Sequence, residues 1–332
     1  MLNLKNQIKP YIIAEIGTNH DGNLKQAKKL VYHAKKVGCD CVKFQSWDET
    51  MWSEVFLKNN LRLSRLIRTL SIDFNFLKKI KEYCSKINIG FASTPFSIKQ
   101  LNELIKLKPT FIKIASMDLN NYPFIEKCAD QKYPVIVSTG MGDIKEILNV
   151  KKIFIKKKKL NVLFMHCVSA YPARFEDLNL KNILYLKKKL KFPIGYSDHS
   201  IGFVAPIQAI TMGVKFIEKH FTISKKGKGF DHKFSANIRE MKNLISYVNQ
   251  SFESLGVYKR IVSKKDKALR KVFRRSAYLK QDIKKGDKIL PENIIFQRPA
   301  TGLSPVEFNN FKGKKVDKNL KKGTLIKKVF FK

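Results

Sequence analysis

The sequence has few acidic residues, and it lacks both paired cysteine motifs and long apolar runs. No stretch approaches the roughly 20 apolar residues that span a bilayer, and residues 1–10 lack the apolar core of a signal peptide. The five cysteines are odd in number and include no CxxC pair, which argues against a disulfide framework or a zinc site. We therefore expect buried thiols, a reducing cytoplasmic location and no membrane partner.

The shortage of acidic residues leaves a large positive charge. Lys and Arg number 66 against 27 Asp and Glu, which gives a formal charge of +39. Such a charge often indicates a nucleic-acid partner, but here the lysines are spread over the faces of helix-like segments such as residues 24–36. We interpret them as solvated surface that attracts small anions, and we expect no nucleic acid. The alternative, a nucleic-acid-binding protein, predicts basic residues on one face and steeply salt-dependent binding.

Short apolar runs recur along the chain, and each ends in a cluster of polar residues. Residues 12–14 precede Glu15, residues 162–165 precede His166, and residues 216–217 precede Glu218. Helix-like stretches separate eight such runs, which predicts eight strand–helix units. This is the pattern of an α/β protein with a (β/α)8 (TIM) barrel, in which catalytic residues lie where the strands end.

After residue 256 the alternation of strand-like and helix-like segments ends. We expect a barrel domain over residues 1–256, a basic linker or exposed helix over 257–272, and a small β-rich domain over 273–332. Strand-like segments are expected at residues 276–279 and 294–297. About sixty residues bury little core, so this domain is expected to lean on the barrel or on a partner subunit.

Two segments of the barrel deserve separate expectations. Residues 46–70 are too long for a simple connection and are rich in aromatic residues, so they form a candidate lid on the catalytic face. Residues 227–232 are glycine-rich but lack the ending of a phosphate-binding P-loop, so we expect a mobile loop that carries Asp231. Asp73 or Asn75 is expected to cap the helix that follows.

Two histidines follow neighbouring predicted strands. His199 and His220 end strands seven and eight, where both imidazoles can reach one ion. The sequence therefore suggests a divalent metal site completed by substrate and water. Two hydrogen-bonded histidines without a metal are the alternative.

Two lysines interrupt apolar strands. Lys43 and Lys113 would line the barrel, and burying an unpaired ammonium is costly, so together they indicate an anionic ligand. A Schiff-base aldolase is the alternative for one of them. By alternation from His220, Lys219 should face out of the barrel. Hydroxyl donors that complete a phosphate and carboxylate cradle are Thr94, Ser116, Ser138 and Ser197.

The acidic residues at the strand ends are few. Glu15 is alone on its strand, so its burial requires a lysine, a sugar hydroxyl or a metal-bound water. Asp198 is a candidate to orient a neighbouring histidine. Asp118 and Asp231 complete the set.

These residues carry a resemblance to the sialic (nonulosonic) acid synthases. The chain resembles that family almost from end to end, with a tail that resembles the family's antifreeze-like (SAF) domain. The motifs are EIGTNHDG at 15–22, VKFQ at 42–45, STPF at 93–96, STGM at 138–141, HC at 166–167, YP at 171–172, SDH at 197–199 and EKHFT at 218–222, with DIKKG at 282–286 and RPATG at 298–302 in the tail.

The resemblance implies an enzyme that condenses phosphoenolpyruvate with an N-acetylmannosamine-type sugar and releases phosphate. It implies that His199 and His220 bind Mn²⁺ or Mg²⁺ and that Glu15, Tyr171 and Asp231 contact the sugar. It also implies a domain-swapped homodimer in which Arg298 binds the acetamido oxygen in the other subunit's site. The residues implied to hold phosphoenolpyruvate are Lys43, Thr94, Lys113, Ser116, Ser138 and Ser197.

The sequence departs from the family pattern around the sugar. Ser169 stands where an asparagine is usual, Phe230 where a proline is usual, and Asp118 where a glutamate is usual. The product is therefore N-acetylneuraminate or a close analogue. Precursors of legionaminic or pseudaminic acid, which carry a second acetamido group and lack a hydroxyl, are the alternative substrates.

Overall fold

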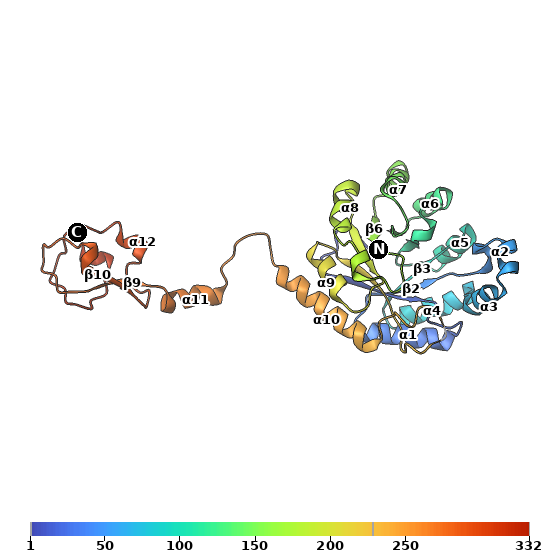
Figure 1. The fold of residues 1–332 in the computed structure, drawn as a ribbon, viewed down its shortest axis with the longest axis horizontal. Coiled ribbons are helices and arrows are strands. Elements are labelled where there is room, and N and C mark those ends of the chain that lie inside the picture. The colour runs from blue at the N-terminus through green and yellow to red at the C-terminus, as the bar shows by residue number, and fades with distance from the viewer. Residues whose placement is uncertain (1, 228, 332) are drawn as a thin grey trace. The chain divides into compact units, whose positions relative to one another are not determined.

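The computed structural model describes residues 2–227 and 229–331, and the chain forms two compact units, residues 1–256 and 257–332. The first unit is a closed barrel in which β1 to β8 follow one another in order and pair in parallel. The predicted (β/α)8 barrel is therefore confirmed (Figure 1). The strands are β1 Tyr11–Gly17, β2 Cys41–Gln45, β3 Gly90–Thr94, β4 Ile112–Ile114, β5 Val135–Ser138, β6 Val162–His166, β7 Ile194–Asp198 and β8 Phe216–His220.

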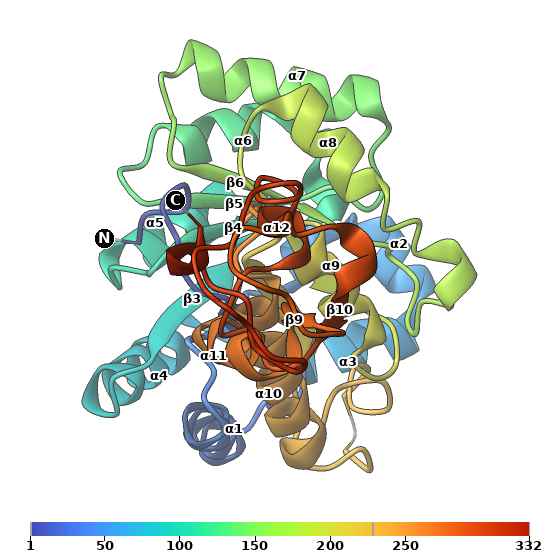
Figure 2. The same ribbon diagram turned by 90° about the vertical axis from the view of Figure 1, so that its left-hand side faces the viewer.

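Helices surround the barrel strands (Figure 2). In α1 the side chains of Ala27, Leu30, Val31 and Ala34 are buried, because their spacing of three and four residues places them on one helix face. The lysines of that helix lie on its other face. The barrel helices are α1 Leu24–Val37, α2 Glu54–Asn59, α3 Leu61–Leu70, α4 Phe74–Lys86, α5 Ile98–Lys106, α6 Tyr122–Ala129, α7 Ile144–Lys156, α8 Asn182–Leu190, α9 Val204–Thr211 and α10 Ile238–Leu255, with short 3-10 turns η1 Glu49–Met51, η2 Ser116–Asp118 and η3 Phe175–Asp177.

The barrel interior is apolar at the amino ends of the strands, called here the floor, and polar at their carboxyl ends. Ile13, Phe111 and Phe216 belong to an interior cluster at the amino ends of the strands, and Leu4 belongs to the same cluster. Because alternate residues of a strand share a face, Glu15 lies on the same side of β1 as Ile13. The charged side chains therefore lie above the apolar floor, at the carboxyl ends of the strands.

The insertion after β2 is helical. It contains η1, α2 and α3, and Asp73 then caps α4 by accepting a hydrogen bond from the Phe76 amide at 2.7 Å. Asp73, and not Asn75, is therefore the N-cap.

The second unit has its own small core around Ala277, Ile289 and Ile326. The antiparallel strands β9 Ser276–Leu279 and β10 Ile294–Gln297 lie at the positions expected from the sequence. The basic segment before them forms a helix, α11 Lys264–Phe273. Of the two predictions for this segment, a linker or an exposed helix, the helix is therefore correct over these residues. The remaining elements are η4 Pro291–Asn293, α12 Pro305–Phe308 and η5 Lys328–Phe330.

All five cysteines are buried and free, as expected. Within residues 2–227 and 229–331, no helix combines the length and the apolarity that crossing a membrane demands.

Candidate active site

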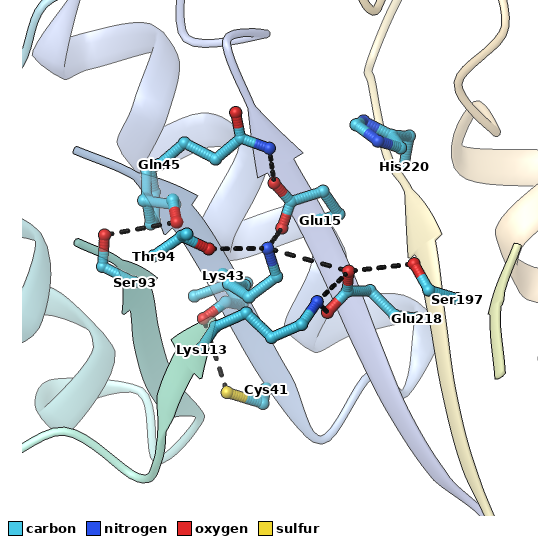
Figure 3. Close-up of polar contacts among 12 residues, drawn as sticks. Glu15, Cys41, Lys43, Gln45, Ser93, Thr94, Lys113, Ser197, Glu218 and His220 are labelled. Atoms are coloured by element: carbon cyan, nitrogen blue, oxygen red, sulfur yellow. Dashed lines mark hydrogen bonds and ion pairs between the residues drawn. The ribbon is translucent and has the colours of Figure 1, made fainter. Parts of the chain in front are cut away.

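Four buried charged side chains form the centre of the site (Figure 3). The Lys43 ammonium on β2 lies 2.6 Å from Glu15 Oε2 on β1 and 3.7 Å from Glu218 Oε1 on β8. The Lys113 ammonium on β4 donates to both carboxylate oxygens of Glu218, at 2.9 and 3.0 Å. Each of the four side chains is at most 6% exposed. The two lysines therefore face one space, as expected, and they are neutralised by two carboxylates.

Glu218 is the site residue that the sequence reasoning missed as a functional group. It bridges the two lysines and accepts a further hydrogen bond from Ser197 Oγ at 3.1 Å. The signal was present, because Glu218 lies two residues before His220 on β8 and so shares its inward face.

The cluster shifts the ionisation of its own members. Burial raises the pKa of Glu15 to about 7, although the Lys43 ammonium opposes this change. Burial by itself would also raise the pKa of Glu218, but Lys113 and Lys43 outweigh it and lower that pKa to about 2. Burial lowers the pKa of Lys113, whereas the two carboxylates outweigh burial at Lys43 and raise its pKa. Glu218 is thus the permanent anion of the cluster, and Glu15 can gain a proton near neutral pH.

Two of the predicted hydroxyl donors contact this cluster directly. Thr94 Oγ1 accepts a hydrogen bond from the Lys43 ammonium at 3.2 Å, and Ser197 binds Glu218. Ser116 and Ser169 form a separate pair, with their hydroxyl oxygens 3.0 Å apart. Ser138 ends β5 and is 5% exposed.

The two histidines lie together beside the charged cluster. The ring centroids of His199 and His220 are 5.6 Å apart. His199 Nδ1 lies 2.6 Å from the Val168 carbonyl oxygen, and donation to that oxygen leaves Nε2 with its lone pair. His220 Nδ1 is buried and has no hydrogen-bond partner. Burial, with His220 adding to it, lowers the pKa of His199 to about 4, and burial with the positive Lys43 lowers the pKa of His220 to about 3.

This arrangement fits a weakly held metal ion. Both imidazoles are neutral at pH 7, and an unpartnered buried nitrogen is the donor that a divalent transition metal accepts. The described residues include no group of three or more His, Cys, Asp or Glu side chains that could hold a metal ion. Substrate and water oxygens would therefore have to supply most of the coordination.

Tyr171 and Asp231 border the histidines. The Tyr171 ring lies 4.2 Å from the His199 ring and 5.7 Å from the His220 ring, between centroids. Asp231 Oδ2 lies 3.5 Å from His220 Nδ1 and accepts hydrogen bonds from the amide and hydroxyl of Thr18, at 3.3 and 3.2 Å. Burial raises the pKa of both Tyr171 and Asp231.

Gly17 lets these groups approach its backbone closely. A side chain at Gly17 would begin 2.5 Å from Asp231 Oδ2, 3.4 Å from Glu15 Oε1 and 3.5 Å from His220 Cε1. Its backbone also adopts φ 51°, which L side chains rarely tolerate. A residue with a side chain at position 17 would therefore displace Asp231 and strain the backbone.

The loop that carries Asp231 is anchored in the structure. Asp21 Oδ1 accepts a hydrogen bond from the Gly229 amide at 2.8 Å and lies 3.1 Å from His232 Nε2. Asn19 Nδ2 donates to the Phe221 carbonyl and to Ser235 Oγ, at 2.9 and 2.8 Å. The sequence suggested a mobile loop, but its described residues are tied to the segment after β1. Lys228 lies outside the described residues.

The structure corrects the expectation for Asp198 and agrees with the expectation for Lys219. Asp198 does not orient a histidine: it accepts from Lys219 at 2.6 Å and from the Tyr196 hydroxyl at 3.0 Å. Lys219 does point away from the barrel interior, but it is 3% exposed and paired with Asp198. The physical reason is that the outer face of a barrel strand packs against helices, and a lysine there needs a counter-charge.

Asp118 and Arg298 lie outside the strands that carry the cluster. Asp118 lies in η2, where its Oδ2 is buried without a hydrogen-bond partner, and burial raises its pKa to about 6. Arg298 belongs to the second unit, where its Nε donates to the Phe273 carbonyl at 2.7 Å. Its predicted role in another subunit's site stays a prediction.

The fold and the site define a class of protein. It is a (β/α)8-barrel protein whose strand ends carry two lysines, two carboxylates and two neutral imidazoles, an arrangement suited to an anionic ligand. The chain belongs to the NeuB family, whose model matches residues 30–260, and the SAF domain model matches residues 274–332. The resemblance inferred from the motifs is thereby confirmed.

Named relatives cover most of the chain. It is 36% identical to the N,N'-diacetyllegionaminic acid synthase of Legionella pneumophila over 95% of this chain and 93% of that protein. It is 35% identical to a pseudaminic acid synthase of Campylobacter jejuni over 99% of this chain and 98% of that protein. A crystal structure of the N-acetylneuraminic acid synthetase from Leptospira borgpetersenii in complex with citrate matches with a TM-score of 0.73 and 34% identity, covering 79% of this chain and 90% of that one.

Proposed function

We propose that the protein is a nonulosonic acid synthase that condenses phosphoenolpyruvate with an acetamido sugar. The observation that carries this proposal is the pairing of two buried lysines with two neutral histidines at the strand ends. The names of the relatives support it, since they include an N,N'-diacetyllegionaminic acid synthase, a pseudaminic acid synthase and an N-acetylneuraminate-9-phosphate synthase.

The lysines bind the anionic substrate. Lys43 and Lys113 would exchange a carboxylate partner for the phosphate or carboxylate of phosphoenolpyruvate, with Thr94, Ser116, Ser138 and Ser197 as hydroxyl donors. Protonation of Glu15, whose pKa is about 7, would remove one competing negative charge as the anion enters. The site can thus accept a highly charged substrate without leaving a buried charge unpaired.

His199 and His220 would hold Mn²⁺ or Mg²⁺. The ion, when bound, supplies Lewis acidity that polarises the aldehyde of the open-chain sugar. The protein contributes the orientation of His199 through the Val168 carbonyl and the unpartnered nitrogen of His220.

The sugar would lie on the side of Glu15, Tyr171 and Asp231. These groups border Gly17 and the two histidines. Asp118 and Ser169 would contact more distant sugar groups. Arg298 of the partner subunit would donate to the acetamido oxygen, a charge-assisted hydrogen bond.

The reaction then balances as follows. A carbon–carbon bond forms between C3 of phosphoenolpyruvate and the aldehyde carbon, whose oxygen gains a proton. The oxygen of a water molecule bonds to C2, and the bond from C2 to the phosphate oxygen breaks. Inorganic phosphate leaves, and the product is a nine-carbon 2-keto acid.

Phosphate release tests the proposal. Purified protein is incubated with phosphoenolpyruvate and a panel of acetamido sugars, with EDTA or with added Mn²⁺. We expect sugar-dependent phosphate release that EDTA abolishes and Mn²⁺ restores. Release unaffected by EDTA would contradict the metal, and absence of release with every sugar would contradict the synthase. Borohydride trapping of a lysine with a carbonyl substrate would instead favour the Schiff-base alternative.

A further inference from the structure

A buried histidine lies in the middle of the segment that anchors the loop after β8. His20 belongs to residues 18–21, and the other three residues of that segment bind the loop. The His20 side chain is fully buried between the rings of Phe44 on β2 and Phe76 on α4, at centroid distances of 6.1 and 5.4 Å. The imidazole is therefore held in place by packing from two neighbouring elements.

The protonation state of His20 follows from its surroundings. Burial lowers the pKa of His20 to about 4, so the ring is neutral at pH 7. Nδ1 accepts a hydrogen bond from the Gly22 amide at 3.0 Å, so the proton lies on Nε2. Nε2 is buried and has no hydrogen-bond partner within residues 2–227 and 229–331. An unpaired buried donor destabilises a folded protein. Stability alone would therefore favour an apolar side chain here, and the feature that histidine adds is the acceptor Nδ1.

The hydrogen bond from Gly22 supports a turn with an uncommon backbone conformation. Asp21 and Gly22 have φ values of 52° and 70°, and the Asn23 amide donates to the His20 carbonyl oxygen at 2.8 Å. Positive φ at both central residues is typical of a type I′ turn, and it is unfavourable for most residues other than glycine. Nδ1 of His20 binds the amide at the centre of this turn, so it helps to keep Asp21 in the left-handed conformation.

The conformation of Asp21 directs its carboxylate to the loop after β8. Oδ1 of Asp21 accepts a hydrogen bond from the Gly229 amide at 2.8 Å and lies 3.1 Å from His232 Nε2. Gly229 and His232 lie on either side of Asp231 in the sequence. The position of Asp231, whose Oδ2 is 3.5 Å from His220 Nδ1, therefore depends on the turn that contains Asp21.

We propose that His20 is a positioning residue, whose Nδ1 fixes the turn that directs Asp21 and thereby holds Asp231 in the site. This inference rests on the proposed function, in which Asp231 contacts the sugar. The role requires an acceptor atom at the place of Nδ1 and no contact between His20 and a substrate. Asparagine supplies such an acceptor, because its side-chain oxygen can bind the backbone amide two residues further along the chain.

Limited proteolysis measures the anchoring of the loop without any substrate. Lys226 is exposed in the loop after β8, and Lys259 is exposed in the segment that follows the barrel. The native full-length protein is digested briefly with trypsin, and mass spectrometry gives the rate of cleavage after each of these two lysines. Cleavage after Lys259 serves as the internal reference, because it does not depend on the loop.

Substitutions at His20 should change only the cleavage in the loop. We expect His20→Leu to raise the rate after Lys226 about fivefold relative to that after Lys259, because the loss of one hydrogen bond changes the open population of the loop by about this factor. His20→Asn should stay within about twofold of the wild type, since it keeps an acceptor. His33→Leu, which replaces a histidine on α1, is the control and should have no effect.

Steady-state kinetics test the role at the sugar. Phosphate release is measured with the acetamido sugar that the wild type uses, while the sugar and phosphoenolpyruvate are varied in turn. We expect His20→Leu to raise the KM for the sugar about fivefold with little change in the KM for phosphoenolpyruvate, and His20→Asn to restore the wild-type value. If His20→Leu does not fold, His20→Met fills the same space with a flexible apolar side chain and allows the same comparison.

The outcomes separate the anchor from the reaction. Unchanged cleavage after Lys226 in His20→Leu, or equal cleavage in His20→Leu and His20→Asn, would overturn the role of Nδ1. A rise after Lys259 as large as that after Lys226 would indicate general loosening and would overturn it as well. Faster loop cleavage with an unchanged KM for the sugar, or equal rises in both KM values, would contradict the positioning of Asp231. If no sugar supports phosphate release, the proposed function fails and the role at the sugar fails with it, whereas the trypsin comparison still decides whether His20 anchors the loop.

Discussion

At the scale of single residues, the two lysines of the cluster have carboxylate partners, Glu15 and Glu218, before any substrate arrives. Removing one member of a buried pair leaves an uncompensated charge, which is far more costly than removing the pair. Under the proposed function, substrate binding at Lys43 and Lys113 would be an exchange of counter-ions, and each lysine should matter for the anion more than for the sugar.

Replacing either lysine tests this assignment. Lys43→Met or Lys113→Met should raise the phosphoenolpyruvate KM or reduce kcat by about tenfold or more, a loss of at least about 1.4 kcal/mol of transition-state stabilisation. Steady-state kinetics with each substrate varied in turn give the measurement, and Lys35→Met on the surface of α1 is the control. Unchanged phosphoenolpyruvate kinetics with weaker sugar binding would mean that the pocket holds the other substrate.

A second buried pair lies on the outer face of the barrel. Lys219 is 3% exposed and donates to the fully buried Asp198. Lys219→Met should lower the free energy of unfolding by about 3–5 kcal/mol, because Asp198 stays behind as a buried, unpaired charge. The matched variant Lys225→Met breaks a pair with Glu240 in which both side chains are more than one third exposed, and it should cost no more than about 1 kcal/mol. Urea unfolding followed by circular dichroism measures both; equal losses would contradict the distinction.

Prediction of single residues from the sequence succeeded where the pattern within one strand was sufficient to mark the residue as unusual. Lys43, Lys113 and Glu15 stand out because each interrupts an apolar strand, and the structure buries all three. Glu218 was missed because its two partners lie 105 and 175 positions earlier in the chain. Asp198 was misassigned because its partners Lys219 and Ser200 face the helices, and strand position alone does not reveal what packs there.

At the scale of elements, the loop after β8 depends on the segment after β1. Asp21→Ala should raise the KM for the sugar about tenfold, since Gly229 and His232 lose their acceptor and Asp231 loses its support. The KM for phosphoenolpyruvate should change little. Asp21→Asn keeps an acceptor oxygen at the same place and should restore most of the affinity. Equal effects of the two substitutions, or an effect on phosphoenolpyruvate alone, would show that Asp21 does not position this loop.

The order of the elements was predictable, and the anchoring of this loop was not. Strand ends, the Asp73 cap and the bounds of β9 and β10 depend on local patterns, and these agree with the structure. The loop was expected to be mobile because glycines dominate its sequence. Its anchors, Thr18, Asn19 and Asp21, lie about two hundred residues away, and no local pattern reports such contacts.

At the scale of the whole molecule, the chain divides into two units, and the smaller one has a core of its own. We expect it to complete the active site of a second subunit through Arg298. Mixing two inactive variants, Lys43→Met and Arg298→Ala, tests this. A mixed dimer has one site with both changes and one with neither, so random exchange of subunits should restore about one quarter of the wild-type sites.

Subunit exchange must be demonstrated in the same samples. Differently tagged subunits co-purified after mixing provide that control, and each variant alone defines the background. If exchange is proven and activity stays at background, or if light scattering shows an active monomer, the site is formed within one chain.

The depth at which Lys43 and Lys113 lie has a consequence for chemical labelling. Lys43 and Lys113 are 2% and 3% exposed and ion-paired, within a chain that has 66 lysines and arginines, most of them outside its core. An amine-acylating reagent needs the uncharged amine at an accessible position. The reagent will therefore modify the surface lysines extensively before it reaches Lys43 or Lys113. Loss of the surface lysine charges will reverse the sign of the surface potential while the two buried lysines stay unmodified.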